Sequence, residues 1–385
     1  MKFLFVVPPL TGHTNPTVSV ARALQARGHE VAWAAHPGTV GKLLPAGATI
    51  LAMPENVSES EAADVTARAK AVRGAAALKF LWEDFLVPLA RSMLPGVEAS
   101  VAEFRPDVMC CDQQALAGGL VARSRGLPWA TLATTSAGVT DPLGSLPEVK
   151  RWLRELIGEL EREAQLPAAE TGELSPQLVI AFTTEALVGP LAQFPAHYQF
   201  VGPSISDRPE PTPFPWDQLG ARPRVLVSMG TVNAEASGRF YQVALAALRD
   251  RPQLRAILAA PPELASDPPS NTLVQRYVPQ LQLLPELDAV VCHGGHNTVC
   301  EALAHGLPLV IAPIKDDQPI VADQVVAAGA GIRVKFGRVN AGELGAAIDR
   351  VLAEPSYRAA AGVVRASFAA AGGAPRAAEL LEALA

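Results

Sequence analysis

The strongest constraint on the fold of this chain comes from two short apolar runs that flank a helical segment. Residues 289–292 and 309–312 read as buried strands, and the residues between them carry apolar side chains at helical spacing until Gly306-Leu307-Pro308 ends the pattern. A strand, a helix and a second strand in this order form a parallel βαβ unit. The C-terminal ends of both strands must therefore lie at the same edge of a sheet.

Polar residues follow both strands at that edge. His293-Gly294-Gly295-His296-Asn297-Thr298 comes after the first strand, and Asp316-Asp317-Gln318 comes after the second. Ligands of open parallel sheets bind outside the strand ends, and a glycine-rich turn that opens a helix directs backbone N–H groups at an anion. We therefore expect a diphosphate at this turn, with side-chain donors from His293, Asn297 and Thr298.

Other residues of the same stretch suit the remaining parts of a nucleotide sugar. Glu301, one turn further along the helix, can accept hydrogen bonds from ribose hydroxyls, and the Tyr277 ring can stack on a nucleobase. Asp317 and Gln318 can accept and donate hydrogen bonds to sugar hydroxyls. An ordinary helix-capping turn would explain the glycines and the asparagine, but it leaves the other polar residues at the strand and helix ends unexplained.

The stretch from Tyr277 to Gln318 resembles the donor-binding signature of the nucleotide-sugar-dependent glycosyltransferases, the class of the plant UDP-glycosyltransferases and bacterial natural-product enzymes. That signature has an aromatic residue and Pro-Gln, a His-x-Gly-x-Asn-Ser/Thr core, a Glu and a final Asp/Glu-Gln, and all of these are present here with the spacing retained. Plant members carry Trp at the positions of Tyr277 and His296, so the choice between UDP and TDP stays open.

A second loop in the same half of the chain also resembles this family. The strand at 225–227 is followed by Ser228-Met229-Gly230-Thr231, which resembles the loop that faces the diphosphate in these enzymes. Together the two resemblances imply a donor site made of Ser228, Gly230, Thr231, Tyr277, Val278, Gln280, His293, Gly295, Asn297, Thr298, Glu301, Asp317 and Gln318.

Length and composition bound the fold and the partners. With 385 residues, of which 49% are hydrophobic and 18% charged, the chain is long enough for two well-buried globular domains. A net charge of −6 with scattered basic residues argues against a nucleic-acid partner. No uncharged apolar run reaches the length of about 20 residues that a membrane-spanning helix needs, so we expect no transmembrane segment.

The first residues and the cysteines favour a cytoplasmic protein. The apolar run at residues 3–7 stops at Pro8-Pro9 without a cleavage site, so it reads as a buried strand rather than a signal peptide. All four cysteines fall within expected strands or helices, which is typical of small buried side chains in a reducing compartment.

The first half of the chain begins with another βαβ pattern. Residues 3–7 and 31–35 read as strands, and we expect the helix between them to start with Asn15 as its N-cap and Pro16 at its first position. No Gly-x-Gly-x-x-Gly motif follows the first strand, which argues against a nicotinamide or flavin enzyme. Further strands are expected at 108–111, 129–133 and 178–182, and further helices at 115–125 and 147–165.

Closely spaced prolines between residues 203 and 215 disfavour a helix and predict a linker. We expect an N-terminal domain at 1–203, the linker at 204–222 and a C-terminal domain at 223–373. The family resemblance implies an α/β architecture of two doubly wound, Rossmann-like domains that face each other across a cleft, the GT-B fold. It also implies that the first domain binds the acceptor, that the second binds the donor, and that a helix at 374–385 packs back onto the first domain.

His13 and Asp112 are the candidate catalytic residues. Each lies at the C-terminal end of a strand in the first half, so we expect His13 to act as the general base and Asp112 to hold its other ring nitrogen. Both residues also resemble the catalytic dyad of the family, although a helix-capping role would explain each one alone. The implied mechanism is direct displacement at the anomeric carbon with inversion, with no metal ion required and no tightly bound cofactor.

An aromatic-rich segment is the candidate acceptor site. Phe80, Leu81, Phe85 and Leu89 have helical spacing in a segment that is rich in aromatic residues. Phe80, Trp82, Phe85 and Ser136 are the candidates to line an apolar pocket. A core-facing helix is the alternative interpretation. The expected product is an O-glycoside of a small apolar natural product, polyketide or phenol, with nitrogen and carbon nucleophiles, the sugar and a homodimer left open.

Two other functions share the predicted layout. A UDP-sugar 2-epimerase needs carboxylates around the donor sugar but no acceptor pocket, and a non-catalytic nucleotide-sugar-binding partner of another transferase needs neither His13 nor Asp112. The aromatic segment and these two residues therefore favour a hexosyltransferase. His293-x-x-His296 beside Cys292 is the sole candidate metal site in the sequence, and we rank it below the diphosphate site.

Overall fold

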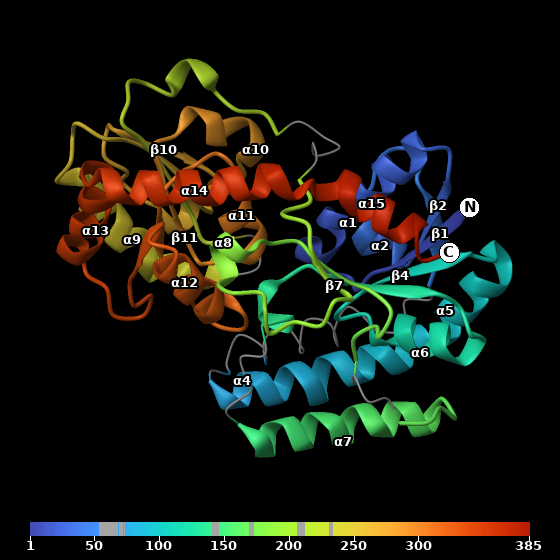
Figure 1. Cartoon of the computed structure of the whole chain (residues 1–385). Coiled ribbons are helices and arrows are strands. Elements are labelled where there is room, and N and C mark those ends of the chain that lie inside the picture. The colour runs from blue at the N-terminus through green and yellow to red at the C-terminus, as the bar shows by residue number, and fades with distance from the viewer. Residues whose placement is uncertain are drawn as a thin grey trace. The chain divides into compact units, whose positions relative to one another are not determined.

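Two parallel β-sheets, one in each of two structural units, form the framework of the chain (Figure 1). The computed structural model describes residues 1–53, 68, 72, 74–140, 146–168, 173–205, 212–230 and 234–385. Unit 1 comprises Met1–Thr183, Pro190–Pro209 and Ala371–Ala385, and unit 2 comprises Thr184–Gly189 and Glu210–Ala370. Each unit combines one parallel sheet with helices, so the predicted α/β class with two Rossmann-like domains is confirmed.

The described part of unit 1 holds seven parallel strands in the order β3-β2-β1-β4-β5-β6-β7. They span Lys2–Val6 (β1), Glu30–Ala35 (β2), Thr49–Ala52 (β3), Val108–Asp112 (β4), Trp129–Ala133 (β5), Val179–Ala181 (β6) and Tyr198–Phe200 (β7). The central strands read as continuous apolar runs because both faces of the sheet are covered. The sequence does not predict the edge strands β3 and β7, because both are short and neither is fully buried.

Helices cover both faces of this sheet. They span Thr11–Ala26 (α1), Pro37–Val40 (α2), Ala75–Lys79 (α4), Val87–Phe104 (α5), Leu116–Arg125 (α6), Pro147–Glu163 (α7) and Gly373–Glu382 (α15). The expected aromatic-rich helix is present, but its middle part, Phe80–Leu86 (η2), is a π-helix between α4 and α5. This helical run lies beside α7 in Figure 1.

The start of α1 differs from the prediction. The helix begins at Thr11, so Asn15 is not its N-cap and Pro16 lies inside it. Leu10 is extended and takes the N-cap position, and its carbonyl accepts a hydrogen bond from the Thr14 backbone N–H at 3.0 Å. The missing N–H of Pro16 removes one helical hydrogen bond near the helix start, a cost that the buried face of α1 outweighs.

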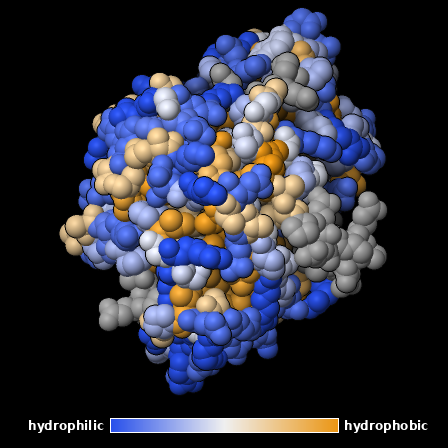
Figure 2. All heavy atoms as spheres, turned by 90° about the vertical axis from the view of Figure 1, so that its right-hand side faces the viewer, coloured by the Kyte–Doolittle hydropathy of each residue, from blue (hydrophilic) through white to orange (hydrophobic). Residues whose placement is uncertain are grey.

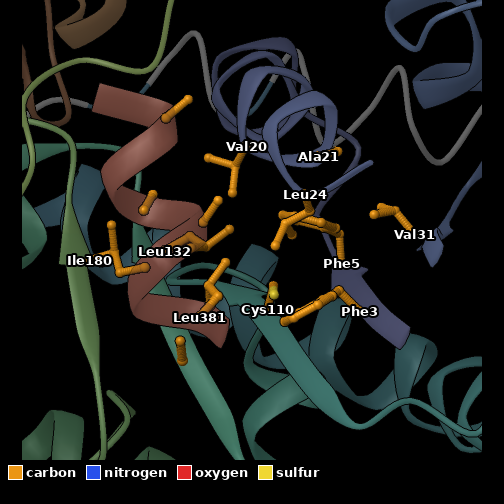
Figure 3. Packing of buried hydrophobic residues seen from close by; sticks show 14 of the residues in the cluster. Phe3, Phe5, Val20, Ala21, Leu24, Val31, Cys110, Leu132, Ile180 and Leu381 are labelled. Carbon is orange, nitrogen blue, oxygen red and sulfur yellow. The ribbon is translucent and has the colours of Figure 1, made fainter. Parts of the chain in front are cut away.

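The core of unit 1 has one apolar layer on each side of the sheet. Phe3 and Phe5 point to the layer beneath α1 and α15, whereas Leu4 and Val6 point to the layer beneath α5 and α6. Figure 3 shows the first layer, where Leu381 of α15 packs beside Leu132 and Cys110 of the sheet. Full burial of each large side chain stabilises the fold by about 1.5–3 kcal/mol, so the strands are held firmly by both layers.

The last helix, α15, belongs to unit 1 although it follows the long helix α14 of unit 2. Gly372 lies between the two helices and Gly373 is the first residue of α15, and their φ angles are positive, at 91° and 57°. Glu382 on α15 accepts hydrogen bonds from Arg27 Nε at 2.8 Å and from His29 Nε2 at 2.5 Å. These contacts and the buried leucine above fasten α15 along α1.

Unit 2 is built on a six-stranded parallel sheet with the order β10-β9-β8-β11-β12-β13 within its described residues. The strands span Arg224–Ser228 (β8), Arg255–Ala259 (β9), Thr272–Gln275 (β10), Ala289–Cys292 (β11), Leu309–Ile311 (β12) and Gly331–Arg333 (β13). The helices span Glu185–Val188 (α8), Gly238–Arg249 (α9), Gln280–Leu283 (α10), His296–Ala304 (α11), Gln318–Ala327 (α12), Ala341–Ala353 (α13) and Pro355–Ala371 (α14). Two apolar clusters, one on each face of the sheet, form the core of this unit.

Hydrophilic and hydrophobic residues are interspersed on the face of the molecule that Figure 2 shows. Within the described residues, no helix has both the length and the apolar character that crossing a bilayer requires.

Candidate functional site

In unit 1 the order of the strands reverses between β1 and β4. Neighbouring strands at such a reversal send their connections to opposite faces, which leaves a crevice at the C-terminal ends of the two strands. His13 lies in the first turn of α1, just after β1, and Asp112 is the last residue of β4. Because Val6 pairs with Cys111 across these strands, the topology places His13 and Asp112 side by side at the crevice.

His13 and Asp112 are hydrogen-bonded to each other. His13 Nδ1 lies 2.9 Å from Asp112 Oδ1 and 3.0 Å from Oδ2. The Asp112 side chain is completely buried, while 15% of the His13 side chain is exposed. The Oδ1 atom also accepts the backbone N–H of Gln114 at 2.8 Å. The structure therefore brings together the two residues that the sequence selected.

This arrangement determines the tautomer of the imidazole. A carboxylate only accepts hydrogen bonds, so His13 Nδ1 must carry the proton that it donates to Asp112. In the neutral ring the proton-accepting nitrogen is then Nε2. A half-buried histidine held in this way can accept a proton from a substrate and be stabilised by Asp112 as it becomes charged.

Thr134 is a third member of this cluster that the sequence did not select. Its Oγ1 atom donates a hydrogen bond to Asp112 Oδ2 at 2.7 Å and lies 2.8 Å from His13 Nδ1. It directly follows β5, the strand that pairs with β4. Residues 134–136 are all hydroxyl-bearing in the sequence, but only the pairing of β4 with β5 reveals which hydroxyl reaches Asp112.

The aromatic segment lies between helices of unit 1. Trp82 is buried in an apolar cluster with Leu86, Leu120 and Leu160, and Phe85 packs against the same cluster. The Arg68 guanidinium lies over the Phe80 ring, 5.4 Å from its centre. Ser136 is buried, with 1% of its surface exposed, and it starts a short 3₁₀ turn after β5 that spans Ser136–Gly138 (η3). These positions agree with a core-facing helix, and the acceptor role of the four residues stays a prediction.

In unit 2 the strand order reverses between β8 and β11, and some of the predicted donor residues lie at that point. Ser228 ends β8, Gly230 follows it, and His293 follows β11. The His293 ring lies between two glycines: a Cβ atom would be 2.6 Å from ring atom Cε1 if added to Gly230, and 2.5 Å from Nε2 if added to Gly295. Both positions therefore need glycine for the ring to stay where it is.

His293 is a half-buried histidine. Burial lowers its pKa below the ordinary value of 6.5, while the nearby Asp317 carboxylate and the Ser228 backbone act in the opposite direction. Its Nδ1 atom is buried and has no hydrogen-bond partner among the described residues. Once protonated at Nδ1, this histidine can donate a hydrogen bond to an anion.

The helix after His293 begins earlier than expected. Gly295 is extended and forms the N-cap of α11, so Asn297 and Thr298 lie in the first turn of the helix rather than in the preceding loop. The first backbone N–H groups of a helix have no helical partners, and the helix dipole adds positive charge there. Both side chains therefore lie at the end of α11 that favours an anion.

The acidic and amide residues of the predicted site have defined partners. Gln280 Nε2 donates to Glu301 Oε2 at 2.5 Å, and Glu301 is 5% exposed. Gln318 Oε1 accepts the backbone N–H groups of Ile314 at 2.9 Å and Lys315 at 3.2 Å. The carbonyl oxygen of Gln318 is thus used within the protein, and its NH₂ group is the part suited to a ligand.

The remaining predicted donor residues differ in exposure. The Tyr277 side chain is 61% exposed, so its ring can stack on a planar ligand, whereas Val278 packs partly into the core. Thr231 lies outside the described residues. No group of three or more His, Cys, Asp or Glu side chains suited to a metal ion occurs in the part of the chain that the structure describes.

A model of a known protein family matches the second half of the chain. Residues 211–367 match the family described as "UDP-glucoronosyl and UDP-glucosyl transferase". This segment includes nearly all of unit 2, with β8, β11 and the residues around His293.

Full-length relatives extend the similarity to unit 1. The chain is 30% identical to 4'-demethylrebeccamycin synthase of Lentzea aerocolonigenes, over 100% of this chain and 99% of that protein. It is also 30% identical to the NDP-glycosyltransferase YjiC of Bacillus subtilis (strain 168), over 97% of this chain and 95% of the relative.

A solved structure with the same fold is that of the spinosyn rhamnosyltransferase SpnG, with a TM-score of 0.77, 26% sequence identity and complete coverage of both chains. The same enzyme has been solved with thymidine diphosphate and with the spinosyn aglycone, and both complexes match with a TM-score of 0.76.

Proposed function

The chain belongs to the UDP-glucoronosyl and UDP-glucosyl transferase family and is a glycosyltransferase with the GT-B fold, and from this premise we propose which groups it joins and how. The proposed reaction moves a hexose from a UDP- or TDP-sugar to a hydroxyl group of a small apolar natural product, such as a polyketide or a phenol. The relatives named as a rebeccamycin synthase and a spinosyn rhamnosyltransferase support an acceptor of this kind.

The single observation that carries the proposal is the hydrogen-bonded pair of His13 and Asp112 at the strand reversal of unit 1. His13 Nε2 takes the proton of the acceptor hydroxyl as the new bond to the sugar forms. Asp112 holds the ring through Nδ1 and stabilises the imidazolium that results. A deprotonated oxygen attacks the anomeric carbon much more readily than a neutral hydroxyl does.

The leaving diphosphate is stabilised by unit 2. His293, with its unpartnered Nδ1 atom, and the N-terminal end of α11 supply hydrogen-bond donors and positive potential where negative charge develops. Ser228, Gly230 and Gly295 let the backbone come close to the phosphates. We propose that these groups suffice without a metal ion and without a resident cofactor, and addition of EDTA should then leave the rate unchanged.

The nucleoside and the sugar occupy the rest of the same edge. Tyr277 stacks on the base, and Glu301, oriented by Gln280, accepts hydrogen bonds from the ribose. Asp317 accepts and the Gln318 NH₂ group donates to sugar hydroxyls, since the Gln318 carbonyl is already used. This division of roles favours a hexose that keeps its hydroxyl groups.

The two domains divide the reaction between them. We assign acceptor binding to residues 1–203 and donor binding to residues 223–373. The residues that we propose to line the acceptor pocket are Phe80, Trp82, Phe85 and Ser136. Because a direct attack places the new bond opposite the leaving group, the configuration of the anomeric carbon inverts. Four free, buried cysteines among the described residues fit the reducing cytoplasm in which nucleotide sugars are made.

Mass spectrometry tests the function. The purified chain is mixed with UDP-glucose or TDP-glucose and a panel of phenolic and polyketide aglycones, and product is detected as an added hexose. We expect product with the wild type, almost none with His13→Ala, and wild-type amounts with the control His197→Ala. Full activity of His13→Ala would remove the proposed base, and an epimerised donor in the absence of any acceptor would favour the 2-epimerase alternative. The coupling constant of the anomeric proton in the product reports inversion.

A further inference from the structure

A buried threonine holds both members of the His13–Asp112 pair. Thr134 is 3% exposed, and its hydroxyl oxygen lies 2.7 Å from Asp112 Oδ2 and 2.8 Å from His13 Nδ1. We propose that Thr134 is a positioning residue for the transfer reaction, which fixes the Asp112 carboxylate and through it the orientation of the His13 ring. This inference rests on the proposed role of His13 as the base.

The donor and acceptor chemistry of the three side chains allows one consistent arrangement. The Asp112 carboxylate accepts only, so the Thr134 O–H is donated to Oδ2 and the Nδ1 proton of His13 points to the same carboxylate. The lone pairs of the Thr134 oxygen then face the Nδ1 proton as well. One hydroxyl therefore satisfies the carboxylate and shares the imidazole proton.

The threonine supplies the constraint that the carboxylate otherwise lacks on one side. Asp112 Oδ1 is fixed by the Gln114 backbone N–H at 2.8 Å, and Oδ2 is fixed by Thr134. With both oxygens held, the carboxylate plane cannot turn, and His13 Nδ1 stays at nearly equal distances from the two oxygens. Without the hydroxyl, the buried Oδ2 atom loses a donor and the carboxylate can rotate, which moves His13 Nε2 away from the acceptor hydroxyl.

The support for Thr134 is rigid. Leu132 on β5 pairs with Asp112 on β4, so Thr134 lies only two residues beyond a paired position of the sheet. Residue 134 is thus placed by the register of two central strands.

The test compares Thr134→Val, which removes the hydroxyl at similar volume, with Thr134→Ser, which keeps it. Thr131→Val is the matched control, because Thr131 is a buried residue of β5, the strand that Thr134 follows, and its hydroxyl accepts the Ser175 backbone N–H at 2.8 Å instead. For Thr134→Val we expect kcat to fall about 10- to 100-fold, with KM for the nucleotide sugar changed less than about threefold. Thr134→Ser and Thr131→Val should keep kcat within about threefold of the wild type.

A double-mutant cycle separates positioning from a general loss of structure. In an Asp112→Asn background the hydroxyl has no carboxylate to fix, so adding Thr134→Val should lower kcat by less than about twofold. The inference is overturned if Thr134→Val costs the same factor in both backgrounds, if it leaves kcat unchanged, or if Thr131→Val lowers kcat as much. Failure of the proposed function looks different: His13→Ala would then remain fully active, whatever position 134 carries.

Discussion

Replacing Gly230 by alanine tests the proposed diphosphate site most sharply, because the added methyl group would meet the His293 ring. The new Cβ atom would lie 2.6 Å from His293 Cε1 and 2.8 Å from Nε2. Ordinary contacts between carbon atoms are about 3.5–4.0 Å, so the ring has to move by about 1 Å. A displacement of about 1 Å in a group that positions the substrate lowers the rate by about 100-fold.

Gly329→Ala is the matched control within the same unit. The φ angles are +73° at Gly230 and +72° at Gly329, so an alanine at either position costs about 1–2 kcal/mol of backbone strain. At position 329 the new Cβ atom would make an ordinary contact, 3.5 Å from the Cβ atom of Ala360. The difference between the two variants therefore reports the contact with His293 and not the strain.

Steady-state kinetics with varied donor, together with calorimetric titration of UDP or TDP, measure the effect. We expect kcat/KM for the donor to fall by about 100-fold in Gly230→Ala and to change by less than about threefold in Gly329→Ala. Both variants should unfold at similarly lowered urea concentrations. Equal kinetics in the two variants would refute the reasoning that His293 contacts the leaving group.

Three further predictions concern single charged or titratable groups. Asp112→Asn should lower kcat by about 10²- to 10⁴-fold with nucleotide affinity unchanged, because the ring loses its negative partner; a loss below about tenfold in the pre-steady-state rate would contradict the proposed pair. Hydrogen bonds from Arg27 and His29 lower the pKa of Glu382 from the ordinary 4.5 to about 2, so its stabilisation is present above pH 4.5 and is lost as the pH falls towards 2. The wild type should unfold at a higher urea concentration than Glu382→Gln, and this difference should shrink as the pH falls from 4.5 towards 2. A difference that stays constant would contradict the lowered pKa of Glu382. Burial lowers the pKa of His293 below 6.5, so the folded state is penalised as the pH falls below 6.5, and a bound diphosphate should raise this pKa. An NMR pH titration of the His293 ring with and without UDP measures this pKa. A pKa that is unchanged at saturating UDP would contradict a contact between His293 and the diphosphate.

The positions of His13, Asp112 and His293 could be predicted from the sequence because each lies at or after the end of an apolar run that reads as a buried strand. The end of such a strand is fixed by the sheet, so the position of the next polar side chain is fixed as well. This rule does not identify Thr134, although that residue also follows a strand. A single threonine has no distinguishing pattern, and its role depends on β4 and β5 being neighbours, which is a long-range fact of topology.

Local conformations account for what the sequence does not predict. Asn15-Pro16 has the pattern of a helix start, yet α1 begins at Thr11 because Leu10 can take the N-cap position without a side-chain bond. The residues Phe80 to Leu86 have helical spacing, but they form a π-helix, in which the wider turn changes the direction of every side chain. The partner of the Gln318 carbonyl is the backbone of its own loop, and no spacing rule indicates it.

In each unit, the residues that we propose to take part in the reaction lie at the C-terminal ends of the strands where the strand order reverses. The contacts that hold His13, Asp112 and Thr134 come from β1, β4 and β5 of unit 1, at the point where its strand order reverses. The proposed anion site around His293 and Gly230 lies where the order reverses between β8 and β11 of unit 2. The groups that we propose to move the proton and to stabilise the leaving diphosphate are therefore placed by central strands. The loops and helices beyond those strands can change the acceptor or the sugar without disturbing either group, which is how one fold can serve many different products.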